Sequence, residues 1–297
     1  MKTLKTSEIH LRDPFVMPRD GKYYLYGTRG QTAIGPAEKL ECFVGTDLSN
    51  WEGPIEVFRA PADFWACENF WAPEVHEYEG AFYMFVTFGA PGRELGTQIL
   101  RSELPTGPFL PHSDGPLTPH DWGCLDGTLY QENDRIYMVF CHEWRQIHDG
   151  AICAIELSRD LKTTIGEPVT LFRASENPNA IPLSNHPPLA HLALTSNDFV
   201  TDGPFFHRTE NGDLLMLWSS FGKDGYFQAI ARSSNGTLFG NWTHDDDLLF
   251  ATNGGHGMVF RAFDGKLMLA MHSPNEGPLE RPMFFELSEI DNTLTVM

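Results

Sequence analysis

Near its start the chain reads RDPFVM at residues 12–17 and GKYYLYGT at residues 21–28. Both stretches are short and apolar, and a glycine between them marks a turn, so they predict the two strands of a hairpin. A third strand, CFVGTDL at residues 42–48, follows and runs into a turn that contains Trp51. This strand–hairpin–strand unit decides the fold, because the chain repeats it.

The unit recurs along the rest of the chain, at intervals of roughly 50–75 residues. Each copy begins with a first strand that has polar or small residues at its entry, and then turns into a more apolar return strand. The return strands are GKYYLYGT (21–28), GAFYMFVTFG (80–89), NDRIYMVFCHEW (133–144), GDLLMLWSSFG (212–222) and GKLMLAMHS (265–273).

Small antiparallel sheets repeated around an axis protect their edges, and propellers are built in this way. We therefore predict an all-β fold, a five-bladed β-propeller that forms a single domain over residues 1–297. Residues 160–200, with several Pro and Asn, interrupt the rhythm and are interpreted as an insertion between blades three and four. A large β-sandwich with accidental internal similarity is the alternative. The expected blades cover about 10–55, 68–110, 124–160, 200–245 and 255–297.

The chain carries 40 acidic and 21 basic side chains, a formal net charge of −19. This charge opposes binding to nucleic acid or anionic membranes and suits a neutral substrate such as an oligosaccharide or polysaccharide. Five cysteines without a C-x-x-C pair indicate reduced thiols. No signal peptide is visible, so a cytoplasmic location is expected as the sequence stands, and a periplasmic or secreted one if a leader has been removed. The sequence predicts no oligomeric state.

In a propeller the first strand of each blade lines the central axis, so residues at the entry of these strands converge on one pocket. The sequence offers a carboxyl group there in four blades and an imidazole in the fifth. Clustered like charges are costly unless some are protonated or hydrogen-bonded, so this set indicates chemistry rather than stability. The residues expected at equivalent points are Asp13, Glu74, Asp126, Asp202 and His256.

Hydrolysis of a glycosidic bond needs such a set. One carboxylic acid protonates the leaving oxygen, and one carboxylate activates water or attacks the sugar. A third carboxyl group nearby holds the pKa of the acid up by repulsion. Phe70, Trp71 and Trp144 flank these strands and are expected to offer aromatic faces to the C–H surface of a sugar.

At these residues the sequence resembles family 43 of the glycoside hydrolases, a five-bladed group of arabinofuranosidases, β-xylosidases, arabinanases and galactosidases. The resemblance runs over essentially the whole chain and is fairly specific only because its motifs occur in order, one in each blade. The motifs are RDPF (12–15), WAPEV (71–75), DGTLY (126–130), TDGPFF (201–206) and GGHGM (254–258).

The resemblance implies a role for each carboxyl group. Asp13 would be the general base, and Asp126 would orient the general acid and tune its pKa. The family carries a Glu as the acid in the fourth blade, whereas this sequence has Asp202, which is shorter by one methylene. A displacement of about 1 Å can cost about 100-fold in rate. Three interpretations stay open: Asp202 is the acid after a compensating shift, Glu74 or Glu143 replaces it, or the pocket binds sugar without efficient hydrolysis.

His256 resembles the axial histidine of this family, which lies near a water or a calcium ion. A hydrogen-bonded core histidine is the alternative. No cofactor is required on this interpretation, and a structural calcium near His256 is the one metal considered. His142 and His272 end their strands on the pocket side and are expected to contact sugar hydroxyls, again with core packing as the alternative.

Two arginines are candidates for the pocket. Arg281 follows the last hairpin, where a substrate-binding arginine would be useful and would pair with Asp13 or Asp126. Arg12 is expected to point to the opposite face of its strand, because side chains alternate along a strand.

The resemblance also implies inversion of the anomeric centre, with the base and acid carboxyl groups about 6.5–9.5 Å apart. We expect exo action on terminal arabinofuranosyl or xylosyl residues, or on galactosyl residues, of plant-type glycans. Long loops would wall the pocket into a blind funnel. These loops cover residues 29–41, 59–70, 89–97, 112–123 and 175–200.

Two other classes of function stay open. A fructosidase-like hydrolase has related blades, but the Asn-Asp-Pro-Asn-Gly signature expected there is replaced by LRDPF at residues 11–15. A non-hydrolytic glycan-binding propeller would keep the same aromatic residues. Repeated Ser-x-Asp-x-Gly-x-x-Trp boxes are absent, which disfavours a sialidase, and the sequence contains no P-loop, H-E-x-x-H or G-x-S-x-G motif.

Overall fold

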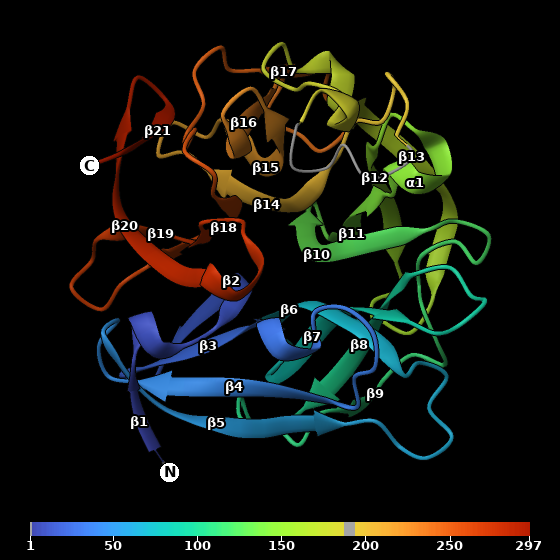
Figure 1. Cartoon of the computed structure of the whole chain (residues 1–297), viewed down its shortest axis with the longest axis vertical. Helices are drawn as coiled ribbons and strands as arrows, with labels where there is room; N and C mark the ends of the chain where they lie inside the picture. The colour runs from blue at the N-terminus through green and yellow to red at the C-terminus, as the bar shows by residue number, and fades with distance from the viewer. Residues whose placement is uncertain (1, 187–193) are drawn as a thin grey trace.

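The protein is described by a computed structural model that covers residues 2–186 and 194–297. Its strands form five antiparallel sheets, each built from one continuous part of the chain. Figure 1 shows these sheets arranged around a central axis, with the first strand of each blade innermost. The predicted five-bladed β-propeller is therefore confirmed. The inner strands are β2 (Leu11–Arg19), β6 (Glu68–Tyr78), β10 (Cys124–Glu132), β14 (Asp202–Arg208) and β18 (Gly255–Arg261).

The remaining strands follow outward in each blade. Blade one adds β3 (Lys22–Arg29), β4 (Lys39–Gly45), β5 (Asn50–Arg59) and, at its outer edge, β1 (Lys2–Lys5). Blade two adds β7 (Ala81–Gly89), β8 (Gly96–Ser102) and β9 (Leu110–Pro111). Blade three adds β11 (Arg135–His142), β12 (Ala151–Leu157) and β13 (Thr164–Arg173). Blade four adds β15 (Leu214–Gly222), β16 (Gly225–Ser233) and β17 (Trp242–His244). Blade five adds β19 (Leu267–Ser273), β20 (Arg281–Ile290) and β21 (Thr293–Val296).

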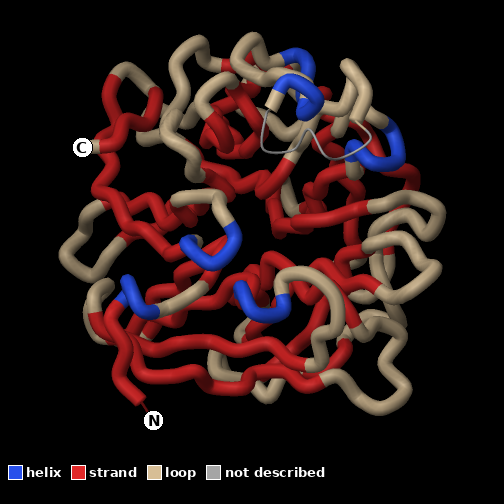
Figure 2. The backbone as a smooth tube through the Cα atoms, viewed as in Figure 1, coloured by secondary structure: helices blue, strands red, loops and turns tan. Residues whose placement is uncertain are grey.

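Helices occur only as short turns in the connections of the described chain, as Figure 2 shows. Among the residues described, no helix is long and apolar enough to cross a membrane. The helical turns are α1 (Trp144–Ile147), η1 (Thr6–Glu8), η2 (Gly30–Thr32), η3 (Ala174–Glu176), η4 (Leu183–Asn185) and η6 (Gly277–Leu279).

The sequence predicted three strands for each blade, whereas each sheet has at least four, so the outermost strands were not predicted. Strand β13 occupies part of the stretch that was expected to be an insertion, so the connection between blades three and four is shorter and runs over residues 174–201. Within the predicted insertion 160–200 and the predicted loop 175–200, residues 187–193 lie outside the described residues.

Every inner strand carries the same irregularity near its entry. Two of its residues stand opposite a single residue of the next strand, and the first of the two has a positive φ between 44° and 57°. Such a bulge interrupts the alternation of side chains along the strand. As a result, the bulge residue and the residue before it can both face the axis. The bulge residues are Asp13, Ala72, Asp126, Gly203 and His256.

This register corrects the expected alignment of the carboxyl groups. In blade two the counterpart of Asp13 is Ala72, and Glu74 comes two residues later. In blade four the counterpart is Gly203, and Asp202 comes one residue earlier. The four carboxyl groups are therefore not at equivalent points, although three of them still reach one cavity.

Four of the five joints between blades are closed by one kind of hydrogen bond. The backbone N–H of the bulge residue donates to a side chain on the second strand of the preceding blade. At the remaining joint Cys141 occupies that second-strand position, and the N–H of Gly203 donates instead to Oδ2 of Asp126 at 3.0 Å. The four regular bonds run from Ala72 to Thr28 Oγ1 (2.8 Å), Asp126 to Thr87 Oγ1 (2.8 Å), His256 to Ser219 Oγ (2.8 Å) and Asp13 to His272 Nδ1 (3.2 Å).

The apolar core is distributed over the joints between blades. Phe85 and Ile99 of blade two pack with Met138 and Phe140 of blade three in one cluster, for example. These side chains are fully buried. The blades therefore hold the inner strands in fixed positions around the axis.

Candidate active site

A cavity of about 300 Å³ lies at the entry of the inner strands. Residues from all five bulge regions line it, together with the start of α1 and several loop residues. Most of its ionisable groups are carboxyl groups and arginine side chains. The ionisable lining residues are Arg12, Asp13, Asp126, Glu143, Arg145, Asp202 and His256.

A buried charge cluster forms the floor of the cavity. Nδ1 of His256 lies 3.2 Å from Oδ1 of Asp13 and 3.8 Å from Oδ2 of Asp126. Burial alone would lower the pKa of His256, but the two carboxylates outweigh it and raise that pKa above its ordinary value. The imidazole is therefore placed to carry a positive charge between the two aspartates.

Asp13 is held as a carboxylate. Oγ1 of Thr28 donates a hydrogen bond of 2.6 Å to its Oδ2, and Nε of Arg12 lies 3.4 Å from its Oδ1. Burial acts to raise the pKa of Asp13, but the positive charges of Arg12 and His256 prevail and hold it well below its usual range. An ionised carboxylate in a closed site is suited to accept a proton from water.

Of Arg12 and Arg281, Arg12 lines the cavity and Arg281 does not. Arg12 lies one residue before the bulge, so its side chain reaches the cavity, contrary to the expectation from simple alternation. Its guanidinium also approaches Glu280, at 3.5 Å. The guanidinium of Arg281 instead donates to the backbone oxygens of Ser7, Pro278 and Glu280. The predicted pairing of Arg281 with Asp13 or Asp126 is thus wrong.

Asp126 and Asp202 have the opposite tendency to Asp13. Burial raises the pKa of Asp126 despite the nearby charge of His256. Burial likewise raises the pKa of Asp202, against the charges of His256 and Arg12 and a hydrogen bond from Tyr226. The hydroxyl of Tyr226 donates to Oδ2 of Asp202 at 3.0 Å. The cavity therefore combines an ionised carboxylate with carboxyl groups that favour the protonated form.

Glu143 is a third carboxyl group of this kind. It follows β11 directly, and its backbone N–H donates to the oxygen of Gly123 at 2.8 Å. It is the N-cap residue of α1, where its Oε2 accepts a hydrogen bond of 3.1 Å from the N–H of Arg145. The side chain is buried, and burial raises its pKa to about 7.

Several predicted site residues are not brought to the cavity. Phe70 is buried in an aromatic cluster with Phe58 and Phe88. Glu74 does not line the cavity, and its Oε2 is 3.1 Å from Nε2 of His76. Trp144, at the start of α1, packs under the guanidinium of Arg145. Of the predicted aromatic residues, Trp71 lines the cavity.

Two predicted histidines, His142 and His272, do not line the cavity. His142 stacks on Trp122 with ring centroids 4.1 Å apart, and its Nε2 is 2.7 Å from Oε1 of Gln146. His272 is fully buried behind Asp13, and burial lowers its pKa to about 3. Both match the core alternative, whereas His256 lines the cavity itself.

Thr28 and Tyr226 were not identified from the sequence. Thr28 holds the carboxyl group of Asp13, and Tyr226 holds that of Asp202. One signal was available for Thr28. Thr28, Thr87 and Ser219 occupy the same position in their return strands. The phenol of Tyr226 comes from β16, a third strand, and no repeated position marks it.

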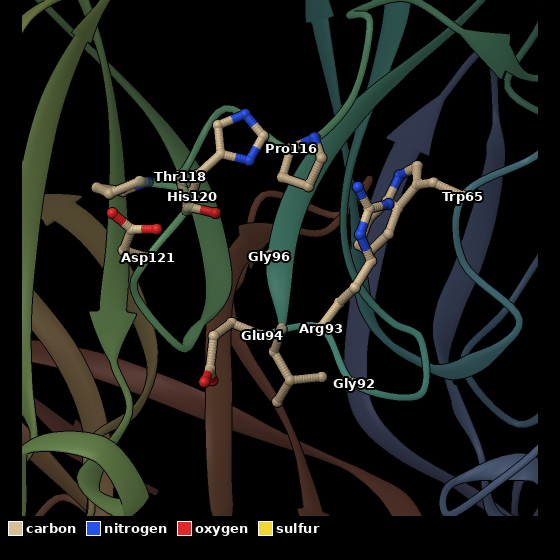
Figure 3. Close-up of a pocket in the computed structure, with 11 residues that line it drawn as sticks. Trp65, Gly92, Arg93, Glu94, Gly96, Pro116, Thr118, His120 and Asp121 are labelled. Atoms are coloured by element: carbon tan, nitrogen blue, oxygen red, sulfur yellow. The ribbon is translucent and has the colours of Figure 1, made fainter.

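A second cavity, of about 610 Å³, adjoins the first through Leu95, which lines both. Figure 3 shows Arg93 reaching toward Trp65 on one side, with His120 and Asp121 on the opposite side. The guanidinium of Arg93 lies 5.5 Å from the centroid of the Trp65 ring. Polar groups and an aromatic wall therefore continue beyond the central cavity.

The calcium considered near His256 stays a prediction. Within residues 2–186 and 194–297, no group of three or more His, Cys, Asp or Glu side chains is arranged to hold a metal ion. Calcium prefers several oxygen ligands, and the His256 ring nitrogen next to Asp13 and Asp126 forms ion pairs instead.

A five-bladed propeller with several carboxyl groups around one axial cavity has the groups that a glycoside hydrolase requires. The chain belongs to family 43: the family described as "Glycosyl hydrolases family 43" matches residues 6–289.

Individual relatives agree with this assignment. The solved structure of an endo-arabinase from Bacteroides thetaiotaomicron is 38% identical, with a TM-score of 0.89 and 99% of each chain covered. The probable arabinan endo-1,5-alpha-L-arabinosidase C of Aspergillus clavatus is 25% identical over 90% of this chain and 76% of that relative. An alpha-L-arabinofuranosidase from Lactobacillus brevis, at 17% identity, a TM-score of 0.75 and coverage of 99% and 97%, shares the fold.

Proposed function

We propose that the protein hydrolyses α-L-arabinofuranosyl linkages in arabinan-type glycans or their oligosaccharides, with inversion at the anomeric carbon. The observation that carries this proposal is the opposed protonation within one cavity: Asp13 favours the carboxylate, while Asp202 and Glu143 favour the acid. The choice of sugar rests on the arabinan-cleaving activity named for the relatives at 38% and 25% identity. Xylosyl and galactosyl residues are the alternative sugars.

In the proposed reaction Asp13 is the general base. It accepts a proton from the water that attacks the anomeric carbon, while a protonated carboxyl group across the cavity donates to the leaving oxygen. Asp126 orients the acid side through its hydrogen bond with the N–H of Gly203, next to Asp202. Trp71 supplies an apolar wall for the sugar ring. General acid–base catalysis of this type contributes about 10²–10⁴-fold for each group.

The net charge of −19 is compatible with this substrate, because arabinan is neutral and is not repelled.

The mode of attack along the glycan has two candidates. Exo action, expected from the long loops, stays a prediction. Endo action is favoured by the second cavity, which offers room beyond one sugar, and by the endo activity in the names of the relatives.

The test is product analysis with linear 1,5-α-arabinan, arabino-oligosaccharides and a panel of aryl glycosides. Arabinose alone at early times would indicate exo action, and a ladder of oligosaccharides would indicate endo action. Proton NMR during the first turnovers should show the β-anomer at the new reducing end, as inversion requires. Sugar binding without cleavage would support the glycan-binding alternative, and cleavage of fructans would support the fructosidase-like one.

A further inference from the structure

We infer that Glu143, at the end of β11 in the third blade, is the group that protonates the leaving oxygen, and that Asp202 of the fourth blade is not. This inference rests on the proposed hydrolysis and assigns one of its two proton transfers.

Burial raises the pKa of Asp202, but three of its neighbours oppose its protonation. Its Oδ2 accepts a hydrogen bond from the buried hydroxyl of Tyr226, and a hydrogen bond donated to a carboxyl oxygen favours the ionised form. The positive charges of Arg12 and His256 act on it in the same direction. Its side chain is also short, and its position in the ladder opposite Ser219 fixes its backbone.

Fewer neighbours oppose the protonation of Glu143, since only the charge and the backbone N–H of Arg145 act against it. Its Oε2 is oriented by the N–H of Arg145, and among the residues that the structure describes none forms a hydrogen bond with its Oε1. The nearest cation, the guanidinium of Arg145, has its Nε 3.9 Å from Oε1, and that side chain is 72% exposed, so water screens its charge. A carboxyl group with one anchored and one free oxygen can carry its proton on the free oxygen.

The charges that face Glu143 support the same assignment. Asp202 and Glu94 are the acidic groups near it, and both act with burial to raise its pKa, while Arg145 acts to lower it. The ordinary pKa of a glutamate is about 4.3. A value of about 7 keeps a substantial fraction of Glu143 protonated at neutral pH.

Glu143 also reaches the right place. Strand β11 packs against β14 at the joint between blades three and four, so the end of β11 lies beside the entry of β14. Glu143 and Asp202 accordingly line the same cavity. The extra methylene of the glutamate and the anchored backbone, bonded to the oxygen of Gly123, give a longer side chain on a fixed base.

The proposed step conserves atoms and charge. The O–H bond of Glu143 breaks as a new O–H bond forms on the glycosidic oxygen, and the bond between that oxygen and the anomeric carbon breaks. The water oxygen bonds to the anomeric carbon, and its proton passes to Asp13. Glu143 ends as a carboxylate and Asp13 as the acid, and exchange with solvent restores both.

The experiment compares Glu143→Gln with Asp202→Asn on leaving groups of different acidity. A proton donor matters for an arabino-oligosaccharide, whose leaving alkoxide is very basic, and matters little for a 2,4-dinitrophenyl α-L-arabinofuranoside. We expect Glu143→Gln to lose about 10²–10⁴-fold in kcat on the oligosaccharide and less than about tenfold on the dinitrophenyl substrate. Its kcat/KM profile should also lose the alkaline limb seen for the wild type.

Controls separate folding from chemistry. Glu286→Gln, a surface variant that breaks the ion pair with Lys266, should behave as the wild type on both substrates. Activity of Glu143→Gln on the dinitrophenyl substrate would itself report a folded site. Glu143→Asp should be partly active on the oligosaccharide, because it keeps the acid at a shorter reach.

Two outcomes would count against the proposals, and they differ. If Asp202→Asn shows the leaving-group dependence and Glu143→Gln does not, the inference is overturned while the proposed hydrolysis stands. If the wild type cleaves neither the oligosaccharide nor the aryl glycosides, the proposed function fails, and the role of Glu143 fails with it.

Discussion

The backbone N–H of Asp13 donates a 3.2 Å hydrogen bond to Nδ1 of His272, and this bond joins the first blade to the last. Nδ1 can accept only when that nitrogen carries no proton, so His272 must be neutral, with its Nε2 proton directed to Oδ1 of Asn275 at 3.1 Å. Closure of the ring and placement of the proposed base therefore depend on one uncharged imidazole.

Acidification should destabilise the fold through His272. Burial lowers the pKa of His272 to about 3, so as the pH falls the unfolded chain binds the proton first. The stability is complete above the unfolded pKa of about 6.5, and about 2 kcal/mol of it is lost between pH 7 and pH 5. Urea unfolding at the two pH values should show a larger drop for the wild type than for His272→Gln. Equal drops would contradict this assignment.

Asp13→Asn should abolish most activity and leave the fold intact. Asp13 has a φ of 51°, a conformation that asparagine adopts at lower cost than alanine, so Asn changes the charge with little strain in the bulge. We expect kcat to fall about 10²–10⁴-fold. The loss should be the same for oligosaccharides and dinitrophenyl glycosides, because the base acts on water and not on the leaving group. A variant that recovers with the better leaving group would argue against the base role.

Asp126→Asn should lower the pKa of His256. In its ionised form Asp126 is one of the two nearest charges that raise it, and asparagine keeps an oxygen that can accept the N–H of Gly203. An NMR titration of the imidazole signals would measure the change. Asp134→Asn, in the turn between β10 and β11, is the control and should leave the His256 titration where it is.

Gly203→Ala should damage both stability and catalysis. Gly203 has a φ of +51°, and an added Cβ would lie 2.6 Å from Cδ2 of His256. Gly21→Ala is the matched control, because its φ is +74° but no atom lies within 4 Å of the added Cβ. The backbone strain alone should cost about 1–2 kcal/mol in Gly21→Ala with full activity. The clash should add about 1–3 kcal/mol in Gly203→Ala, together with a loss of kcat. Similar unfolding energies for the two variants would rule out the clash.

Trp71→Ala and Trp65→Ala should separate the two cavities. Trp71 lines the central cavity, and its loss should lower kcat/KM for aryl glycosides and oligosaccharides alike. Removing one buried apolar contact of about 1.5 kcal/mol corresponds to about tenfold. Trp65 lines the second cavity, and its loss should affect only longer chains. An effect of Trp65→Ala on aryl glycosides equal to that of Trp71→Ala would contradict a separate role for the second cavity.

The fold could be predicted because the pattern of turn, apolar return strand and exit turn recurs five times. The outer strands escaped this pattern, since an edge strand can be as short as β9, with two residues, and carry little apolar content. The first-strand motifs also located three of the carboxyl groups that line the cavity.

The alignment within each motif could not be read from the sequence. Ala72 has a φ of 44°, although alanine is not a residue type that favours a positive φ. Nothing in WAPEV therefore indicates that the bulge falls on Ala72 and not near Glu74. The corresponding bulge at Asp13 brings Arg12 to the cavity, although side chains normally alternate along a strand. The pKa of Glu143 depends on the burial that its neighbours create, which no local motif records.

The joint between blades three and four limits which substitutions the protein can accept during evolution. At the other joints an uncharged side chain supports the backbone, and two of these side chains, Thr28 and His272, also contact Asp13 and so serve both assembly and chemistry. At this joint a single oxygen of Asp126 serves both purposes. Cys141 occupies the second-strand position, and the N–H of Gly203 donates to Asp126 instead. Selection for robustness and selection for turnover therefore act on the same atom.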